Sequence, residues 1–218
     1  MVGSKRQGVA ERLKSDGLVA IVRGDFTLAE QRLIAEALAA GGVKVLEVTL
    51  NTTDALESIA ALHRDFDDLL VGAGTVRTAE DAKAALEAGA QFLIAPCLDG
   101  ETIKVAHDHD TLILPGIFTA TEAQTAFRAG CTMLKLFPAD ALGPTYLKAL
   151  RAPLDDIDFV PTGGVNPETI ASFHEAGAAA FGIGSYLVKN VRVTQGEADA
   201  LTRRAQRLRE ALGRARGV

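Results

Sequence analysis

The chain has 218 residues, of which 48% are hydrophobic and 23% charged, and its formal net charge is −5 at pH 7. This apolar fraction excludes a disordered chain, two cysteines exclude a disulfide-stapled scaffold, and no apolar run reaches the roughly 20 residues of a membrane helix. Because the N-terminus also lacks a signal-peptide core, we expect a cytoplasmic protein that binds neither membrane nor, given its negative charge, nucleic acid.

Short apolar runs alternate along the chain with longer alanine-rich segments of helical character. After an N-terminal helix over 5–16, the pattern predicts eight strands in chain order: 18–23, 43–50, 69–76, 92–96, 112–117, 133–138, 159–163 and 179–185. A helical segment follows each strand, and a C-terminal helix is predicted over 197–214. Strands that are apolar on both faces and separated by helices are typical of a parallel sheet covered by helices.

An Ala-Gly pair ends four of the helical segments directly before a strand, at Gly41, Gly89, Gly130 and Gly177. Glycine at such a position fits a left-handed C-cap. The four pairs recur about every two βα units, which predicts that 1–218 form one (β/α)8 TIM barrel. An open doubly wound sheet is the alternative, but no GxGxxG motif follows the first strand.

Three ionisable residues interrupt the apolar strands, namely Arg23, Glu47 and Lys135. An apolar environment favours the neutral form of a lysine amine, which is the nucleophile that Schiff-base chemistry on a ketone requires. Burial similarly suits a glutamate to general acid/base work. The alternative is that Lys135 and Glu47 form an ion pair that only fills the barrel.

Glycines cluster after the last two strands. Pro161-Thr162-Gly163-Gly164 ends the seventh strand, Asn166-Pro167-Glu168 is expected to open the next helix, and Gly184-Ser185 ends the eighth strand. Backbone amides of glycine loops and a helix N-terminus bind anions, and these two loops of a βα barrel commonly hold phosphate. The sequence therefore predicts a phosphate site here.

Each of the weaker candidates for a site residue has both a structural and a functional interpretation. Thr75 ends the third strand, where its hydroxyl is either structural or a ligand for a carboxylate. Asn51 and Thr52 either cap the next helix or contact a ligand. Cys97 is interpreted as a small filler rather than a nucleophile, because no histidine is evidently paired with it. The six arginines between 203 and 216 are interpreted as the solvated face of an amphipathic helix.

The strand ends together resemble the class I aldolases that act on 2-keto-3-deoxy-6-phosphogluconate and its galactonate epimer. The resemblance runs from Leu18 to Leu187 through the phrases AIVRG, AGGVKVLEVTLNT, VGAGTV, FLIAPCLD, LPGIFTATEA, MLKLFPAD, VPTGGVNPE and GIGSYL. It implies that Lys135 forms the Schiff base and Glu47 shuttles protons. It also implies that Thr75 and the region of Pro96 hold the pyruvyl end of the substrate. The phosphate would be bound by Gly163, Gly164, Gly184 and Ser185.

The resemblance implies cleavage of a phosphorylated keto acid to pyruvate and glyceraldehyde 3-phosphate, without metal or cofactor, by a homotrimer. Arg23 would anchor anionic groups of the substrate. Asn51 stands where gluconate-type members have arginine, whereas Thr162 is the gluconate-type choice, so the preferred epimer stays open. Three alternatives remain. The chain could cleave 4-hydroxy-2-oxoglutarate, it could be a barrel isomerase or synthase that uses Glu47 as base, or it could be a non-catalytic phospho-sugar sensor.

Overall fold

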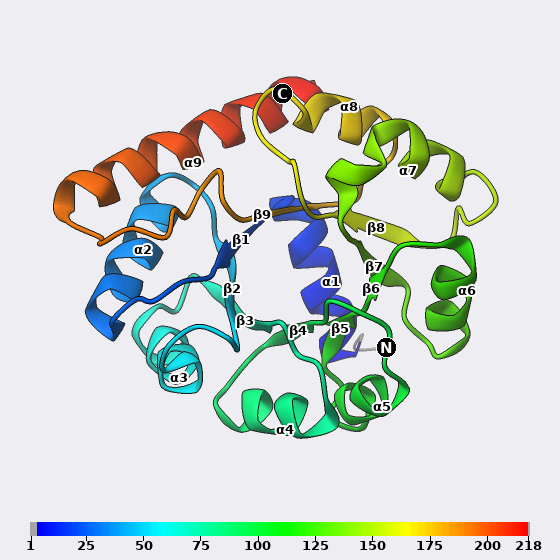
Figure 1. The fold of residues 1–218 in the computed structure, drawn as a ribbon, viewed down its shortest axis with the longest axis horizontal. Helices are drawn as coiled ribbons and strands as arrows, with labels where there is room; N and C mark the ends of the chain where they lie inside the picture. The colour runs from blue at the N-terminus through cyan, green and yellow to red at the C-terminus, as the bar shows by residue number, and fades with distance from the viewer. Residues whose placement is uncertain (1–3, 218) are drawn as a thin grey trace.

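The computed structural model describes residues 4–217, so that residues 1–3 and 218 of the predicted domain lie outside the described part. Figure 1 shows helices arranged as a ring around a curled, entirely parallel sheet. The strands are β1 Leu18–Val22, β2 Val45–Thr49, β3 Leu70–Gly74, β4 Phe92–Ile94, β5 Leu112–Leu114, β6 Gly116–Ile117, β7 Met133–Leu136, β8 Asp158–Pro161 and β9 Phe181–Ile183.

The helices that surround the sheet are mostly short. They are α1 Lys5–Asp16, α2 Leu28–Ala40, α3 Ala55–Asp65, α4 Ala79–Glu87, α5 Gly100–Asp108, α6 Ala120–Arg128, α7 Gly143–Arg151, α8 Ile170–Glu175 and α9 Gln195–Arg216, with a 3-10 turn η1 at Ala139–Ala141.

The strands close into a barrel. Six pair in the order β5-β4-β3-β2-β1-β9 and three in the order β6-β7-β8. A bridge between Thr162 and Gly182 joins β8 to β9, and β5 and β6 are one strand position interrupted only at Pro115. The predicted strand 112–117 is split there because proline has no N–H for the ladder. The Pro115 carbonyl still accepts a hydrogen bond from the Lys135 amide at 3.1 Å. The (β/α)8 barrel predicted from the sequence is thereby confirmed.

Most helix ends follow the local signals in the sequence. Gly89, Gly130 and Gly177 have φ angles of 91–93° and occupy the left-handed region that glycine adopts without strain. The prediction for Gly41 is wrong by one residue, because its φ is −82° and the left-handed residue is Gly42.

Two apolar cores hold the barrel together. One fills the space between the strands and the outer helices, and the other lies inside the barrel. Leu13 of α1, which is fully buried, joins the inner core beside Phe92 and Leu114, with Val9 and Ala10 packed against it. Helix α1 crosses the centre of the barrel in Figure 1 and closes the end where the strands begin.

The C-terminal helix begins two residues earlier and ends two later than predicted. Thr194 caps its start by accepting from Glu197 N, and left-handed Gly217 ends it. Its apolar stripe is buried as the sequence indicated, and Arg203, Arg207 and Arg214 are exposed as predicted. The interpretation is wrong for Arg204, Arg209 and Arg216, which contact other parts of the chain. Arg209 pairs with Asp16 at 2.7 Å, and others of the group, Arg204 and Arg216, donate to backbone carbonyls of Leu187, Lys14 and Ser15.

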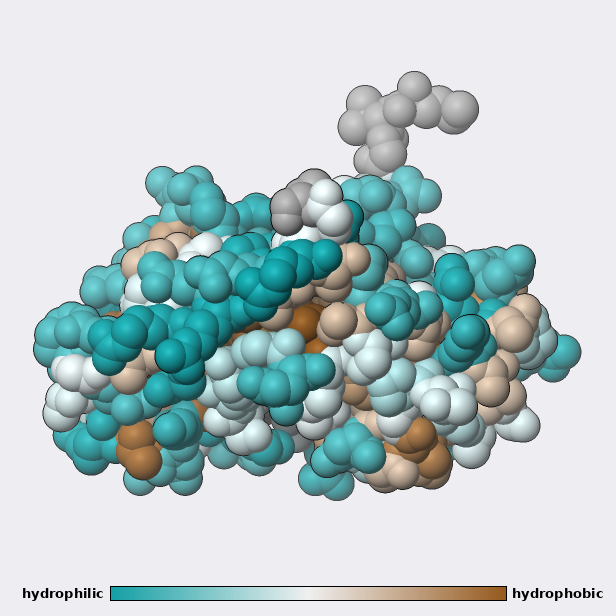
Figure 2. Space-filling view, turned by 90° about the horizontal axis from the view of Figure 1, so that it is seen from above, coloured by the Kyte–Doolittle hydropathy of each residue, from teal (hydrophilic) through white to brown (hydrophobic). Residues whose placement is uncertain are grey.

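The face that carries α8 and α9 is predominantly hydrophilic, with small apolar patches (Figure 2). Among residues 4–217, no helix is long and apolar enough to cross a membrane.

Candidate active site

A cavity of about 500 Å³ opens at the carboxyl ends of the barrel strands. It brings together all eleven residues that the sequence singled out for a site: Arg23, Glu47, Asn51, Thr75, Pro96, Lys135, Thr162, Gly163, Gly164, Gly184 and Ser185. The sequence did not single out seven further lining residues as site residues: Ile21, Thr49, Phe137, Val165, Asn166, Gly182 and Tyr186. The motif LKLFP could have indicated Phe137, since it lies two positions after Lys135 in a strand and so on the same face.

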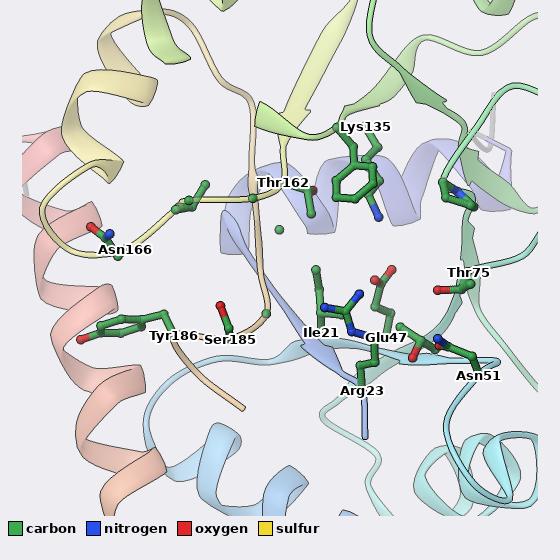
Figure 3. A pocket seen from close by; sticks show the side chains of 18 residues that line it. Ile21, Arg23, Glu47, Asn51, Thr75, Lys135, Thr162, Asn166, Ser185 and Tyr186 are labelled. Carbon is green, nitrogen blue, oxygen red and sulfur yellow. The ribbon is translucent and has the colours of Figure 1, made fainter. Parts of the chain in front are cut away.

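Lys135 occupies the middle of β7 and points its amine into the cavity (Figure 3). The side chain is buried, and its Nζ atom lies 4.9 Å from the centre of the Phe137 ring, which is cation–π distance. Within the described part of the chain, no carboxylate oxygen lies close enough to Lys135 for an ion pair. The interpretation of Lys135 and Glu47 as a filling ion pair is therefore wrong.

Glu47 lies in β2 and is 1% exposed. Its Oε2 atom is buried and has no hydrogen-bond partner among residues 4–217. Burial raises the pKa of the Glu47 carboxyl, and the positive charges of Lys135 and Arg23 oppose part of this rise. A carboxyl in this state holds a proton at higher pH than an ordinary glutamate, which suits a group that must both accept and return one.

Glycine at position 74 makes room for this carboxyl. A Cβ atom there would lie 2.6 Å from the carboxyl carbon of Glu47, closer than real Cβ contacts allow. Glycine at 116 has a related part, since a Cβ there would collide with the carbonyl of Pro96. The absence of a side chain at Gly74 and Gly116 thus lets the Glu47 carboxyl and the Pro96 carbonyl lie close to these strands.

Thr75 follows β3 with a φ of 57°, in the left-handed region that a β-branched residue rarely occupies. Backbone strain of this kind costs of order 1–3 kcal/mol and is typical of binding sites. The hydroxyl reaches the cavity near Asn51 and Glu47 (Figure 3). The geometry therefore favours the ligand-binding interpretation of Thr75 over the structural one.

The other end of the cavity is rich in backbone amides. Gly163 and Gly164 have φ angles of 103° and 72°, and their amide groups, like that of Ser185, have no acceptor elsewhere in residues 4–217. The predicted helix start at Asn166 is wrong, because Asn166 Oδ1 instead accepts from Glu168 N and Thr169 N in a turn before α8. Any anion-binding capacity at this end would therefore come from loop amides and not from the start of a helix at Asn166.

Two weaker interpretations fail. Asn51 and Thr52 do not cap α3, since its N-cap is Asp54 and has no side-chain capping bond. Cys97 is exposed and does not line the cavity, so it is not a packed filler. In the described range, no cluster of three or more His, Cys, Asp or Glu side chains could hold a metal ion.

Comparison with known proteins agrees with this geometry. The sequence profile of the family described as "KDPG and KHG aldolase" matches residues 9–204. The chain is 40% identical over 177 residues to the 2-dehydro-3-deoxy-6-phosphogalactonate aldolase of Escherichia coli strain K12, covering 79% of this chain and 84% of that one. It is 36% identical over 181 residues to the 2-dehydro-3-deoxy-phosphogluconate aldolase of Treponema pallidum, covering 83% and 86%.

Solved structures give the same grouping. A native KDPGal structure superposes with a TM-score of 0.87 at 35% identity, covering 92% of this chain and 96% of that one. The KDPG aldolase of Legionella pneumophila, solved with pyruvate captured as a covalent carbinolamine intermediate, superposes with a TM-score of 0.82 at 30% identity, covering 91% and 97%. The fold, the site and these matches define an aldolase, which is a lyase. The chain belongs to the KDPG and KHG aldolase family.

Proposed function

We propose that this Schiff-base aldolase cleaves a 2-keto-3-deoxy-6-phospho sugar acid to pyruvate and glyceraldehyde 3-phosphate, with Lys135 as the nucleophile. The observation that carries the proposal is that Lys135 and Glu47 are both buried in one cavity without pairing. Burial raises the pKa of the Glu47 carboxyl, which suits it to exchange a proton, and the Lys135 amine points into the same cavity, where a bound ketone can reach it. Relatives named for both phosphorylated epimers support this substrate class.

The reaction follows from these two side chains. The amine of Lys135 attacks the C2 ketone and water leaves, giving a protonated imine that accepts electrons. Glu47, directly or through water, takes the proton of the C4 hydroxyl, and the C3–C4 bond breaks. The electron pair of that bond forms an enamine, and glyceraldehyde 3-phosphate departs. Protonation of the enamine at C3 and hydrolysis of the imine then release pyruvate and regenerate the amine.

The remaining lining residues divide between the two ends of the substrate. Thr75, Asn51 and the backbone around Pro96 lie on the Lys135 side of the cavity and would hold the carboxylate of the pyruvyl end. Among the residues that line the cavity, Arg23 is the cation besides Lys135, and it would take the place of the arginine that gluconate-type relatives carry at position 51.

The free amides form the opposite end of the cavity. Gly163, Gly164, Gly184 and Ser185 would bind the phosphate through backbone N–H groups. Relatives named "KHG/KDPG aldolase" support a second activity of the same site on 4-hydroxy-2-oxoglutarate, which lacks the phosphate. Family membership favours these cleavages over the isomerase or synthase and the non-catalytic sensor.

A homotrimer in the cytoplasm stays our proposal. One similar chain, with a TM-score of 0.87 and 35% identity, belongs to a protein cage designed by fusing symmetric oligomeric domains. Exposed apolar side chains at Phe118 and Val191 are available for such contacts. Light scattering of the purified protein should give three times the chain mass of 22.9 kDa. A monomeric mass would contradict assembly.

Pyruvate release tests the proposed reaction. Wild-type protein should produce pyruvate from either phosphorylated epimer, detected by coupling to lactate dehydrogenase and NADH. Lys135→Met should lose this activity by at least about a thousandfold, because no other described amine lies in the cavity. Tight binding of the substrate without pyruvate release would instead support the sensor.

A further inference from the structure

Two buried threonines, one at the end of β2 and one after it, contact one backbone carbonyl of β1. The hydroxyl oxygens of Thr49 and Thr52 lie 3.4 Å and 3.3 Å from the carbonyl oxygen of Val22, and 3.0 Å from each other. Each hydroxyl carries one proton and can also accept one, so the three oxygens share two hydrogen bonds. We call this group of Val22, Thr49 and Thr52 the threonine triangle.

A second set of ties lies a few residues further along both segments. Gln31 of α2 is buried, and its Nε2 donates to the carbonyls of Phe26 and Thr53 at 3.3 Å and 3.4 Å. Thr53 Oγ1 also donates to Asp25 Oδ1 at 2.8 Å. Segments 22–26 and 49–53 are therefore fastened to each other at both ends.

Arg23 and Asn51 lie between these two sets of ties. Both side chains reach the cavity on either side of Glu47 (Figure 3), and neither forms a hydrogen bond with another residue of the described range. With no direct contact to hold them, their separation is set by the two backbone segments that carry them. The threonine triangle is the buried tie at the strand end of that connection, and hydrogen bonds are electrostatically stronger in a low-dielectric interior than in water.

We infer that Thr52 is a positioning residue: its hydroxyl fixes the spacing of Arg23 and Asn51 and thereby the recognition of the substrate carboxylate. This inference rests on the proposed function, which gives Arg23 and Asn51 their part in binding. Thr52 itself does not line the cavity, so it touches neither substrate nor reacting atoms. Thr49 belongs to the same triangle but does line the cavity, so it is not a clean probe.

Kinetics of Thr52→Val test the inference, since valine keeps the shape and removes the hydroxyl. KM for the keto acid and the dissociation constant for pyruvate should both rise about tenfold, because the anchoring groups lose their spacing. The value of kcat should stay within about a factor of two, since Lys135 and Glu47 are untouched. Thr52→Ser, which restores the hydroxyl, should return KM to near wild type.

Thr111→Val is the matched control. Thr111 is buried like Thr52, at 1% against 5% exposed. Its hydroxyl donates to the carbonyl of His109 at the same 3.3 Å, and it precedes β5 at the opposite end of the barrel. Both variants should lower the melting temperature, but only Thr52→Val should raise KM. Equal melting losses with no change in KM would show that Thr52 is merely structural and would overturn the inference.

Hydrogen–deuterium exchange of the unliganded proteins separates this inference from the proposed function. Amides of segments 22–26 and 49–53 should exchange faster in Thr52→Val than in wild type or Thr111→Val. If wild-type protein released no pyruvate, the proposed function would fail, and exchange alone would decide the inference. Unchanged exchange in both segments would overturn it whatever the enzyme does.

Discussion

Glu47 links burial, charge and chemistry in one side chain. Its pKa is raised because burial destabilises the ionised form more than Lys135 and Arg23 stabilise it. A carboxyl whose native pKa lies above its unfolded value of about 4.3 makes folding less favourable as the pH rises through that native value. The same residue that serves the reaction therefore weakens the fold at high pH.

Glu47→Gln should separate these two effects. At pH 8 the variant should unfold at a higher urea concentration than wild type, and the difference should vanish near pH 3, below the unfolded pKa of about 4.3, where Glu47 is protonated in both states. Its kcat should fall by about two to four orders of magnitude, since glutamine cannot take a proton. Equal stability of wild type and variant at pH 8 would show that the buried Glu47 carboxylate does not destabilise the fold. The control is Glu57→Gln, at an exposed position of α3.

Thr162 tests which epimer the cavity prefers. Its side chain lies where β8 meets β9, at the bridge to Gly182, and lines the cavity. Replacing the hydroxyl by a methyl group in Thr162→Val should shift the ratio of kcat/KM for the two C4 epimers toward galactonate. Steady-state assays on both epimers measure this ratio. If it stays unchanged, Thr162 is no determinant and Asn51 becomes the residue to examine.

Most of the site could be predicted at the residue scale because charged and glycine residues are conspicuous in apolar strands. Tyr186 could not, since an aromatic side chain in an apolar context carries no such contrast. The failed pairing of Lys135 with Glu47 has another cause. Residues that share a barrel interior need not lie in contact, and the sequence does not give the distance between them.

At the scale of elements, Glu30 joins two parts of the chain. It completes the capping box of α2 with Thr27 and accepts from the amide of Val193, near the end of the loop that carries Ser185. These bonds, with that from Val193 first, lower the pKa of Glu30 to about 2. Arg192 adds a salt bridge at 3.2 Å.

Glu30→Gln should lower the free energy of unfolding at pH 7 by about 3 kcal/mol, the value of a shift from about 4.3 to about 2. Because the native pKa is lowered, this stabilisation is complete above pH 4.3 and lost as the pH falls toward 2. Urea unfolding at pH 7 and pH 3 measures it. Glu122→Gln is the control, since Glu122 caps α6 in the same way but has no distant partner. Equal losses for both variants would refute the link to Val193.

Local sequence signals predicted the elements better than their connections. The Thr27-to-Glu30 spacing indicates a capping box, but nothing in the sequence connects Glu30 with Val193. The apolar pattern of 112–117 predicts one continuous strand, whereas Pro115 divides it into β5 and β6. The contacts of Arg209 and Arg216 with α1 could not be predicted for the same reason, since these partners are distant in the sequence.

At the scale of the whole molecule, α1 acts as a plug for the barrel. Leu13 is fully buried in the inner core with Phe92 and Leu114, at the end opposite the cavity. The sequence predicts a helix over 5–16 but not that it enters the inner core, because a helical pattern does not say what the apolar residues cover.

Leu13→Ala should lower the free energy of unfolding by about 2–5 kcal/mol, as expected for a fully buried leucine. The kcat of the folded variant should stay near wild type, since the substitution lies at the closed end. Urea unfolding and steady-state kinetics check the two parts, with exposed Glu11→Ala of the same helix as control. A loss below about 1 kcal/mol would mean that α1 does not plug the barrel.

The central claim is that Lys135 carries the reaction as an imine. Borohydride reduction in the presence of pyruvate, followed by peptide mass spectrometry, tests it most directly. A reduced pyruvyl adduct is predicted on the peptide that contains Lys135, and Lys135→Arg should give none. An adduct on another lysine, or no adduct in a preparation that releases pyruvate, would contradict the account.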